Sequence, residues 1–450
     1  MIKVSISNKN YLEKEYICKT LFCEYLGQEI NILKEDVVDY KIKLENGSEL
    51  IIKDHFFSNF ENDNQYLNKD YLPKTIEFCT NEYIIEDNLP IIFGKSNIQT
   101  AKKKIICSID IFSSSYFMLS RWEEYIDESK DLHNRSLGIN SIAYKNNFLD
   151  RPVVNEYTEM LYFMLKKLDS TIQRKTNQYQ FLLTHDVDVL KKWKNSITFT
   201  KSLFGDIFKR KDLLKAKNNI VEYSNIKLGI KKDEMNSFSY LMDLSEKNGV
   251  KSHFFFMSGG KTKYENFYNI KSEEVMKLIK KIFDRGHKVG FHPSYNTYNN
   301  EQMWKEELDL LENICSEKIE YGRQHYLNFS IPDTWQIWDN NHMKWDSSLG
   351  YPDKAGFRCG TCYKFKPFNI VSRKTLELFE IPLLCMDVTF TKYYNYGPQQ
   401  MLKKIQEIII KTKNYDGIFS LLWHNSSLYP SEWVPFSRIY NQILKIASSK

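Results

Sequence analysis

The stretch Phe181-Leu182-Leu183-Thr184-His185-Asp186-Val187-Asp188 carries the strongest signal in this sequence. Its apolar start predicts a short buried strand. Two carboxylates, one residue apart, follow at the end of that strand, which is where parallel α/β sheets place their active sites. One carboxylate is suited to hold a metal ion and the other to take a proton from water.

From Gln180 onward the sequence alternates between strand and helix patterns. The predicted strands are Phe181–Leu183, His253–Phe256, Lys288–Phe291, Gly322–Tyr326, Gly356–Arg358, Leu383–Asp387 and Ile418–Trp423. The predicted helices are Asn236–Asn248, Ser272–Arg285, Glu301–Lys318 and Gln399–Lys411. The first two helices end just before a glycine, as helices commonly do. The alternation predicts an α/β fold, a distorted (β/α)7-like barrel of parallel strands.

The length of 450 residues favours two domains. Residues 1–150 have mixed α/β character. Predicted helices there are Glu13–Tyr25 and Ser113–Tyr125, and predicted strands are Glu49–Ile52 and Lys104–Ser108. We therefore expect a smaller α/β accessory domain over residues 1–150 and the barrel over residues 151–450.

Composition sets broad limits on the class of protein. A hydrophobic content of 42%, a charged content of 27% and a net charge of +6 describe an ordinary globular protein and do not indicate a nucleic-acid partner. Residues 191–232, however, carry 12 Lys and Arg against three acids. This basic insertion has two interpretations: a solvated helical surface, or a contact with an anionic glycan or a membrane surface.

No apolar run is long enough to predict a transmembrane helix. The sequence begins without a basic segment followed by an apolar one, so we expect no signal peptide, a cytoplasmic location and reduced thiols. Cys359 and Cys362 form one Cys-x-x-Cys pair without a second pair, which favours a turn with two buried thiols over a zinc site.

Polar residues suited to catalysis recur at or near the ends of the predicted strands. They are Asp186, Asp188, His292, Arg323, His325, Asp346 and His424. A divalent ion held by imidazole and carboxylate groups lowers the pKa of water and polarises a carbonyl oxygen. A second carboxylate can then act as base, an Arg beside it holds it ionised, and a His can protonate a leaving amine.

Over residues 178–440 these motifs resemble the polysaccharide deacetylase family, the NodB-homology carbohydrate esterases. Thr184–Asp188 resembles the family segment that supplies a base and a metal-binding aspartate. The resemblance implies that Asp186 is the base and Asp188 a metal ligand. Leu422-Trp423-His424 resembles a later family motif, which implies that His424 is the catalytic acid.

Two further motifs are similar to those of the family. Arg323-Gln324-His325-Tyr326 resembles Arg-x-Pro-Tyr, with His325 in place of proline, which implies that Arg323 orients the base. Trp345–Ser348 resembles the acidic segment that supports the acid histidine, which implies that Asp346 has this role.

The segment Gly290–Asn296 departs from the family pattern. His292 matches the first ligand of the family's His-x-x-x-His, but Asn296 stands where the second histidine is expected. Asn296 would be a weak zinc ligand because it offers a neutral amide. The alternatives are that His185, Ser294 or water completes the ligand set, or that the site is metal-poor and inactive.

The resemblance implies a metal-dependent hydrolase that removes an acyl group, usually acetyl, from an amino sugar of a cell-surface polysaccharide or its precursor. The implied cofactor is a divalent ion, zinc with cobalt or manganese as substitutes. Asn296 favours the alternative of an inactive glycan-binding or scaffold protein. Hydrolysis of another C–N bond, in a small cyclic substrate, is a third hypothesis. The segments 110–125 and 151–157 resemble an α/β domain that precedes this module in a bacterial subgroup.

Overall fold

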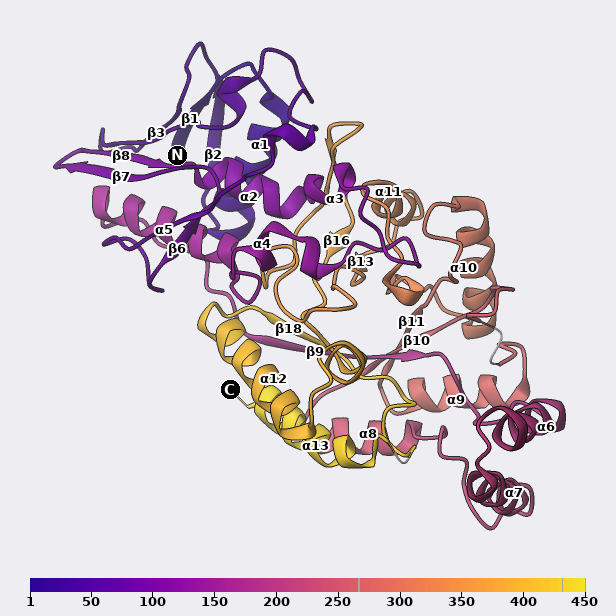
Figure 1. Ribbon diagram of the computed structural model, residues 1–450. Coiled ribbons are helices and arrows are strands. Elements are labelled where there is room, and N and C mark those ends of the chain that lie inside the picture. Colours follow the sequence, from indigo (N-terminus) through magenta and orange to yellow (C-terminus); the bar gives the residue numbers. More distant parts are fainter. Residues whose placement is uncertain (266–267, 431, 450) are drawn as a thin grey trace.

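The computed structural model describes residues 1–265, 268–430 and 432–449, which fold around two main sheets (Figure 1). The first sheet is mixed and contains, in sheet order, β2 (Ile30–Lys34), β1 (Ile2–Ile6), β3 (Tyr40–Lys43), β4 (Glu49–Ile52), β8 (Lys104–Ile109) and β7 (Gly94–Ala101). A small hairpin, β5 (Glu77–Cys79) and β6 (Leu89–Ile91), lies beside it.

The described residues of the N-terminal region also contain five α-helices. They are α1 (Tyr11–Lys19), continued by a π-helical turn over Thr20–Tyr25, then α2 (Ile111–Ser120), α3 (Trp122–Ile126), α4 (Ile142–Lys145) and α5 (Val153–Leu168). The predicted strands and helices of the N-terminal part are thus present, with the second helix divided at Arg121, whose φ of 54° interrupts it. The long helix α5 packs against α2, β4 and β8.

The second sheet consists of eight short parallel strands and curls into a half-barrel. In sheet order these are β16 (Phe379–Glu380), β13 (Trp345–Asp346), β12 (Tyr321–Gly322), β11 (Lys288–Phe291), β10 (His253–Phe256), β9 (Gln180–Val187), β18 (Ile418–Leu422) and β17 (Cys385–Met386). Every adjacent pair is parallel. This architecture confirms the predicted α/β barrel-like fold class.

The predictions for the barrel strands differ from the structure in three respects. Of the predicted strand Gly322–Tyr326 only Gly322 lies in β12, because the chain turns into a short helix over His325–Leu327. Gly356–Arg358 is not a strand. Gly356 has a φ of +137°, and a Cβ there would lie 2.5 Å from the carbonyl oxygen of Leu149, so the chain passes close to the N-terminal region instead of joining the sheet. The two-residue strands β13 and β16 were missed because they are too short to form a periodic pattern.

Helices flank the barrel sheet. They are α8 (Phe238–Lys247), α9 (Glu273–Asp284), α10 (Glu301–Cys315), α11 (Asp333–Asn340), α12 (Pro398–Asn414) and α13 (Val434–Ser448). All four predicted helices are confirmed, and Gly249 and Gly286 end α8 and α9 with φ values of 69° and 73°. The basic insertion forms α6 (Ser196–Phe204) and α7 (Leu213–Lys227). No helix of the described residues is long and apolar enough to cross a bilayer.

The two regions share a continuous hydrophobic core, in which Tyr16 packs against Phe368 and Tyr25 against Tyr363. A buried polar network also joins them. Glu124 of α3 accepts hydrogen bonds from Arg358 Nε at 3.0 Å and from Arg121 Nη2 at 2.8 Å. Buried charges are tolerated when they are paired in this way.

Replacing Glu124 by alanine should therefore destabilise the whole molecule. The change leaves Arg121 and Arg358 buried without their shared carboxylate, which costs about 3–5 kcal/mol of unfolding free energy. Urea denaturation followed by circular dichroism measures it. Glu128→Ala, which removes an exposed glutamate paired with Lys69, is the matched control and should change the stability little. Equal losses in the two variants would contradict the proposed role of the network.

Candidate metal and catalytic site

The carboxyl ends of four strands bring titratable side chains into one pocket of about 390 Å³. Asp186 and Asp188 come from the end of β9, and His292 follows β11. His325 lies in the short helix η6 (His325–Leu327) that follows β12, and His424 follows β18. This convergence at one edge is what a parallel sheet dictates.

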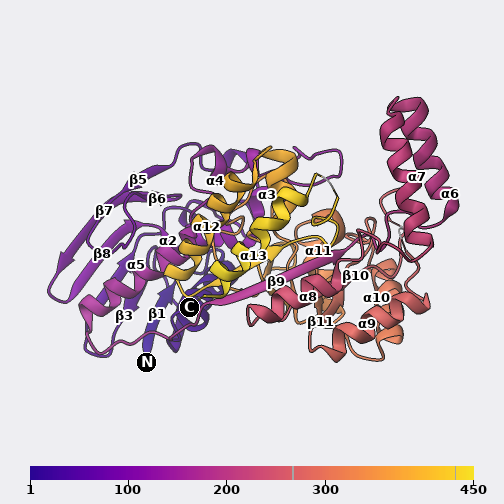
Figure 2. The ribbon, with the colours of Figure 1, turned by 90° about the horizontal axis from the view of Figure 1, so that it is seen from below.

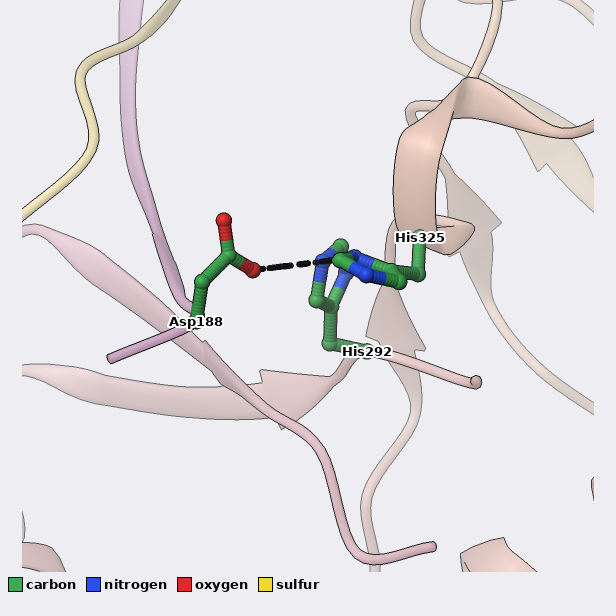
Figure 3. Close-up of side chains that lie close together, drawn as sticks. All are labelled: Asp188, His292 and His325. Atoms are coloured by element: carbon green, nitrogen blue, oxygen red, sulfur yellow. Dashed lines mark hydrogen bonds and ion pairs between the residues drawn. The ribbon is translucent and has the colours of Figure 1, made fainter. Parts of the chain in front are cut away.

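Asp188, His292 and His325 form a cluster with metal-ligand chemistry. One ligand atom from each lies within 4.8 Å of the others (Figure 3). Asp188 Oδ1 is 3.4 Å from His292 Nε2 and 3.6 Å from His325 Nδ1. Two imidazoles and one carboxylate are the usual three protein ligands of a catalytic zinc site, which leaves a fourth position for water.

The hydrogen bonds of the two histidines orient their lone pairs toward the cluster. His292 Nδ1 is 2.6 Å from the carbonyl oxygen of Arg323, and His325 Nε2 is 3.2 Å from that of Tyr264. A carbonyl oxygen only accepts, so each of these nitrogens carries the proton. The other nitrogens, His292 Nε2 and His325 Nδ1, then face each other at 3.0 Å as acceptors.

The surroundings favour a positive charge between these groups. Asp188 Oδ1 is buried without a hydrogen-bond donor. Burial by itself would lower the pKa of His292, but the carboxylates of Asp186 and Asp188 raise it above its ordinary value. Burial lowers the pKa of His325 to about 4, so this ring is neutral, the form that coordinates metal. The residues therefore fit a divalent cation.

Asp186 lies beside the cluster and is held by a fully buried arginine. Arg323 Nη1 donates to Asp186 Oδ1 and to Thr184 Oγ1, both at 2.9 Å, and Arg323 Nε donates to the carbonyl oxygen of Ser347 at 2.7 Å. Asp186 Oδ2 remains directed toward His292 Nε2, 3.8 Å away. This arrangement leaves one carboxylate oxygen of Asp186 without a bond to Arg323 and available as a base.

His424 also lies beside the cluster, with its Nε2 3.8 Å from Asp188 Oδ2. Its Nδ1 is 2.7 Å from Asp387 Oδ1, and its backbone N–H donates to Asp387 Oδ2 at 2.8 Å. Burial opposes the charged ring, but Asp387 raises the pKa of His424 to about 9. The imidazole ring of His424 is therefore protonated at neutral pH, and its Nε2–H faces the pocket as a proton donor.

Asp387, the last residue of the predicted strand Leu383–Asp387, therefore has the supporting role toward His424 that was expected of Asp346. Asp346 lies on β13 and accepts from Ser348 Oγ at 2.6 Å, next to Glu380 of β16. The assignment of Asp346 as the partner of His424 is corrected accordingly. An acid at the end of an apolar run was the signal that could have identified Asp387.

The structure also corrects the expected third ligand. Asn296 is exposed and is not among the residues that line the pocket. The Ser294 hydroxyl donates to Glu307 at 2.5 Å, and His185 faces away from the pocket, bound to the carbonyl oxygen of Trp423 and to Ser252. His325, and none of these three residues, stands at the position of the third metal ligand. The sequence motif Arg323-Gln324-His325 contains this histidine.

The N-terminal region contributes to the pocket as well. His133 and Arg135 line it, together with Tyr326 and Tyr393. Arg135 Nη1 donates to the carbonyl oxygen of Tyr326 at 3.0 Å, and Arg135 Nη2 donates to the hydroxyl of Tyr393 at 3.1 Å. No local pattern predicts these contacts, because residues 133 and 135 lie far from the barrel motifs along the chain.

Asp346 and Glu380 form a coupled pair of acids behind Arg323. Burial raises the pKa of Asp346 to about 6. Burial, together with the neighbouring carboxylate of Asp346, raises the pKa of Glu380 well above its ordinary value. Trp335 Nε1 and the backbone N–H of Leu349 donate to Glu380. The folded protein thus holds a proton that the unfolded chain releases at lower pH.

Stability should therefore fall as the pH rises. The pKa values of this acid pair are higher in the folded protein than in the unfolded chain. The pair therefore contributes its full share of the free energy of unfolding below about pH 4, and this share is lost as the pH passes through 6. In Glu380→Gln the amide replaces the protonated acid, so this dependence should flatten by on the order of 1 kcal/mol. Urea denaturation across this range measures the slope. Glu377→Gln, an exposed change on the same segment, should keep the wild-type slope, and an unchanged slope in Glu380→Gln would contradict the shared proton.

Comparisons with known proteins give a domain family and three distant structural likenesses. A family of unknown function, DUF7033, matches residues 2–170. No curated protein matches the chain. A putative polysaccharide deacetylase from Mycobacterium smegmatis is 12% identical with a TM-score of 0.40, covering 61% of this chain and 85% of that one.

The chitin deacetylase from Colletotrichum lindemuthianum is 12% identical with a TM-score of 0.32, over 61% of this chain and 87% of that one. A CE4 family pseudoenzyme from Bacillus anthracis is 13% identical with a TM-score of 0.31, over 60% and 62%. The chain is similar to these proteins at a level too low to carry a conclusion about its activity.

Proposed function

We propose that this protein is a metal-dependent hydrolase that removes an N-acyl group, acetyl above all, from an amino sugar of a cell-surface polysaccharide or its precursor. One observation carries the proposal: the cluster Asp188, His292 and His325 lies between a carboxylate held by arginine and a histidine held by aspartate. These are the parts that hydrolysis of an amide requires.

Asp188, His292 and His325 would hold the ion, and zinc suits a set of two imidazoles and one carboxylate best, with cobalt or manganese as substitutes. A divalent ion bound there lowers the pKa of water and polarises the carbonyl oxygen of an amide.

Two further residues, Asp186 and His424, each carry out one of the two proton transfers. Asp186, held in place by Arg323, accepts a proton from the attacking water. His424, held by Asp387 through Nδ1, donates its Nε2 proton to the nitrogen of the leaving amine. Asp186 Oδ2 lies nearest His292 Nε2 and His424 Nε2 lies nearest Asp188 Oδ2, so the base and the acid approach the cluster at different ligands.

The pocket also supports a small acyl group and a sugar. Leu327, Met386 and Leu422 are buried in a separate apolar cluster beside the site, and all three line the pocket, which suits a methyl group. The rings of Tyr326 and Tyr393 offer apolar faces for a sugar. The hypothesis of an inactive protein rested on Asn296, and a second imidazole from His325 removes that ground.

The first test is the metal content of the purified protein after equilibration with zinc or cobalt and gel filtration. Wild type should retain about one ion per chain. Asp188→Ala, His292→Ala and His325→Ala should each lose it, because each variant removes one of the three protein ligands that a catalytic ion needs. Asn296→Ala is the matched control and should retain the metal. Retention by His325→Ala together with loss by Asn296→Ala would restore the ligand expected from the sequence.

The second test separates chemistry from metal binding. Asp186→Asn and His424→Ala should each lower kcat for deacetylation of an N-acetylated amino-sugar oligosaccharide by roughly a hundredfold or more, because each removes one proton transfer. Their metal content should equal that of wild type. Asp309→Asn, at the outer surface of α10, is the control and should keep full activity. Unchanged turnover in His424→Ala would remove this residue as the acid.

A further inference from the structure

The basic insertion forms a helical hairpin that stands out from the body of the molecule (Figure 2). It runs from α6 through the π-helical turn η5 (Gly205–Lys209) into α7. It leaves the barrel directly after β9 and Asp188, at the sheet edge that carries the pocket. The N-terminal sheet lies at the opposite end of the molecule in both ribbon views (Figures 1 and 2).

Internal contacts give the hairpin a fixed inner face. The rings of Phe199 and Tyr223 stack with their centroids 4.0 Å apart, and Trp193 packs edge-on against both. Near the tip, the buried Asp206 accepts from Arg210 Nε at 2.6 Å and from Asn219 Nδ2 at 2.7 Å. The outward side chains are therefore held outward by the packing of the inner face.

The tip presents large apolar side chains to solvent. Phe204, Phe208, Leu213 and Leu214 are 57%, 69%, 69% and 70% exposed, and the rings of Phe204 and Phe208 stack at 5.6 Å. An exposed apolar group of this size, surrounded by polar residues, is typical of a surface that binds a partner or a membrane.

The charge around this apolar tip is net positive, with five Lys and Arg against two acids over residues 204–217. Lys209, Lys211 and Lys217 are exposed and form no ion pair with any described residue. The acids of the insertion are already engaged: Asp206 pairs with Arg210, and Asp212 caps α7 by accepting from the backbone N–H of Lys215. Glu222 pairs with Lys192 and Lys231 at the base of the hairpin.

We propose that the tip of this hairpin docks on the surface of an anionic lipid bilayer. Phe204, Phe208, Leu213 and Leu214 enter the interface between headgroups and acyl chains, and the lysines beside them meet the lipid phosphates. A second copy of this chain is a poorer occupant, because two tips of the same sign repel. This inference is independent of the proposed hydrolysis, although it would bring the edge of the sheet that holds the pocket toward the membrane.

Flotation of the full-length protein with lipid vesicles tests the docking. Binding is expected to vesicles of phosphatidylcholine mixed equally with phosphatidylglycerol, to be absent with phosphatidylcholine alone, and to decrease with salt. The triple variant Phe208→Ser, Leu213→Ser, Leu214→Ser should reduce the bound fraction at least about tenfold. The charge variant Lys209→Gln, Lys211→Gln, Lys217→Gln should do the same.

Matched controls carry the same chemical changes elsewhere on the surface. The apolar control replaces three exposed side chains outside the hairpin: Val38→Ser, Val371→Ser and Ile410→Ser. The charge control replaces three exposed lysines of the hairpin formed by β7 and β8: Lys95→Gln, Lys102→Gln and Lys103→Gln. Both controls should bind as wild type does, and all variants should keep wild-type metal content and far-UV circular dichroism.

Three results would overturn the docking proposal. The first is undiminished vesicle binding by the apolar tip variant, and the second is equal binding to neutral and anionic vesicles. The third is absence of vesicle binding; a dimer in light scattering that the tip variant abolishes would then assign the tip to a second copy. Metal content and deacetylation of a soluble oligosaccharide remain separate readouts, so failure of docking and failure of the proposed hydrolysis are distinguishable.

Discussion

The buried ion pair between Arg323 and Asp186 is the interaction on which the site depends. Arg323 is fully buried and bonds to Thr184 and Asp186 on one strand and to Ser347 beyond another, so it fixes β9, β12 and β13 relative to one another. A buried guanidinium is tolerated only when it is well paired and hydrogen-bonded. Gly322 permits this geometry, since a Cβ there would lie 1.8 Å from the carbonyl oxygen of Phe291.

The alternation of side chains along β9 decides which residues reach the pocket. Thr184 and Asp186 point to Arg323, and Asp188 continues the same face into the metal cluster. His185 points to the opposite face, and burial lowers its pKa to about 4. The histidine that directly precedes Asp186 is thus a neutral packing residue on the outer side of the sheet.

The candidate ligand set shows that a metal site is defined by positions in space and not by a fixed spacing in the sequence. Asn296 lies at the surface, and the imidazole that its position lacks comes from His325, on the neighbouring strand connection. The same holds for the acid: His424 is paired with Asp387 of the adjoining strand end, while Asp346 shares a proton with Glu380 behind Arg323.

The sequence by itself determined the parallel α/β sheet, most of its strands and four of the six described helices that flank it. It also determined the placement of Asp186, Asp188, His292, Arg323 and His424 at one edge, because these features follow from local periodicity and from the geometry of parallel strands. Only the tertiary structure decided the pairings. Which carboxylate meets His424, which imidazole joins Asp188, and that Arg135 of the N-terminal region reaches the pocket all depend on how far-apart segments pack. Local pattern has no access to such contacts, since residues separated by tens or hundreds of positions are brought together by the burial of the shared core.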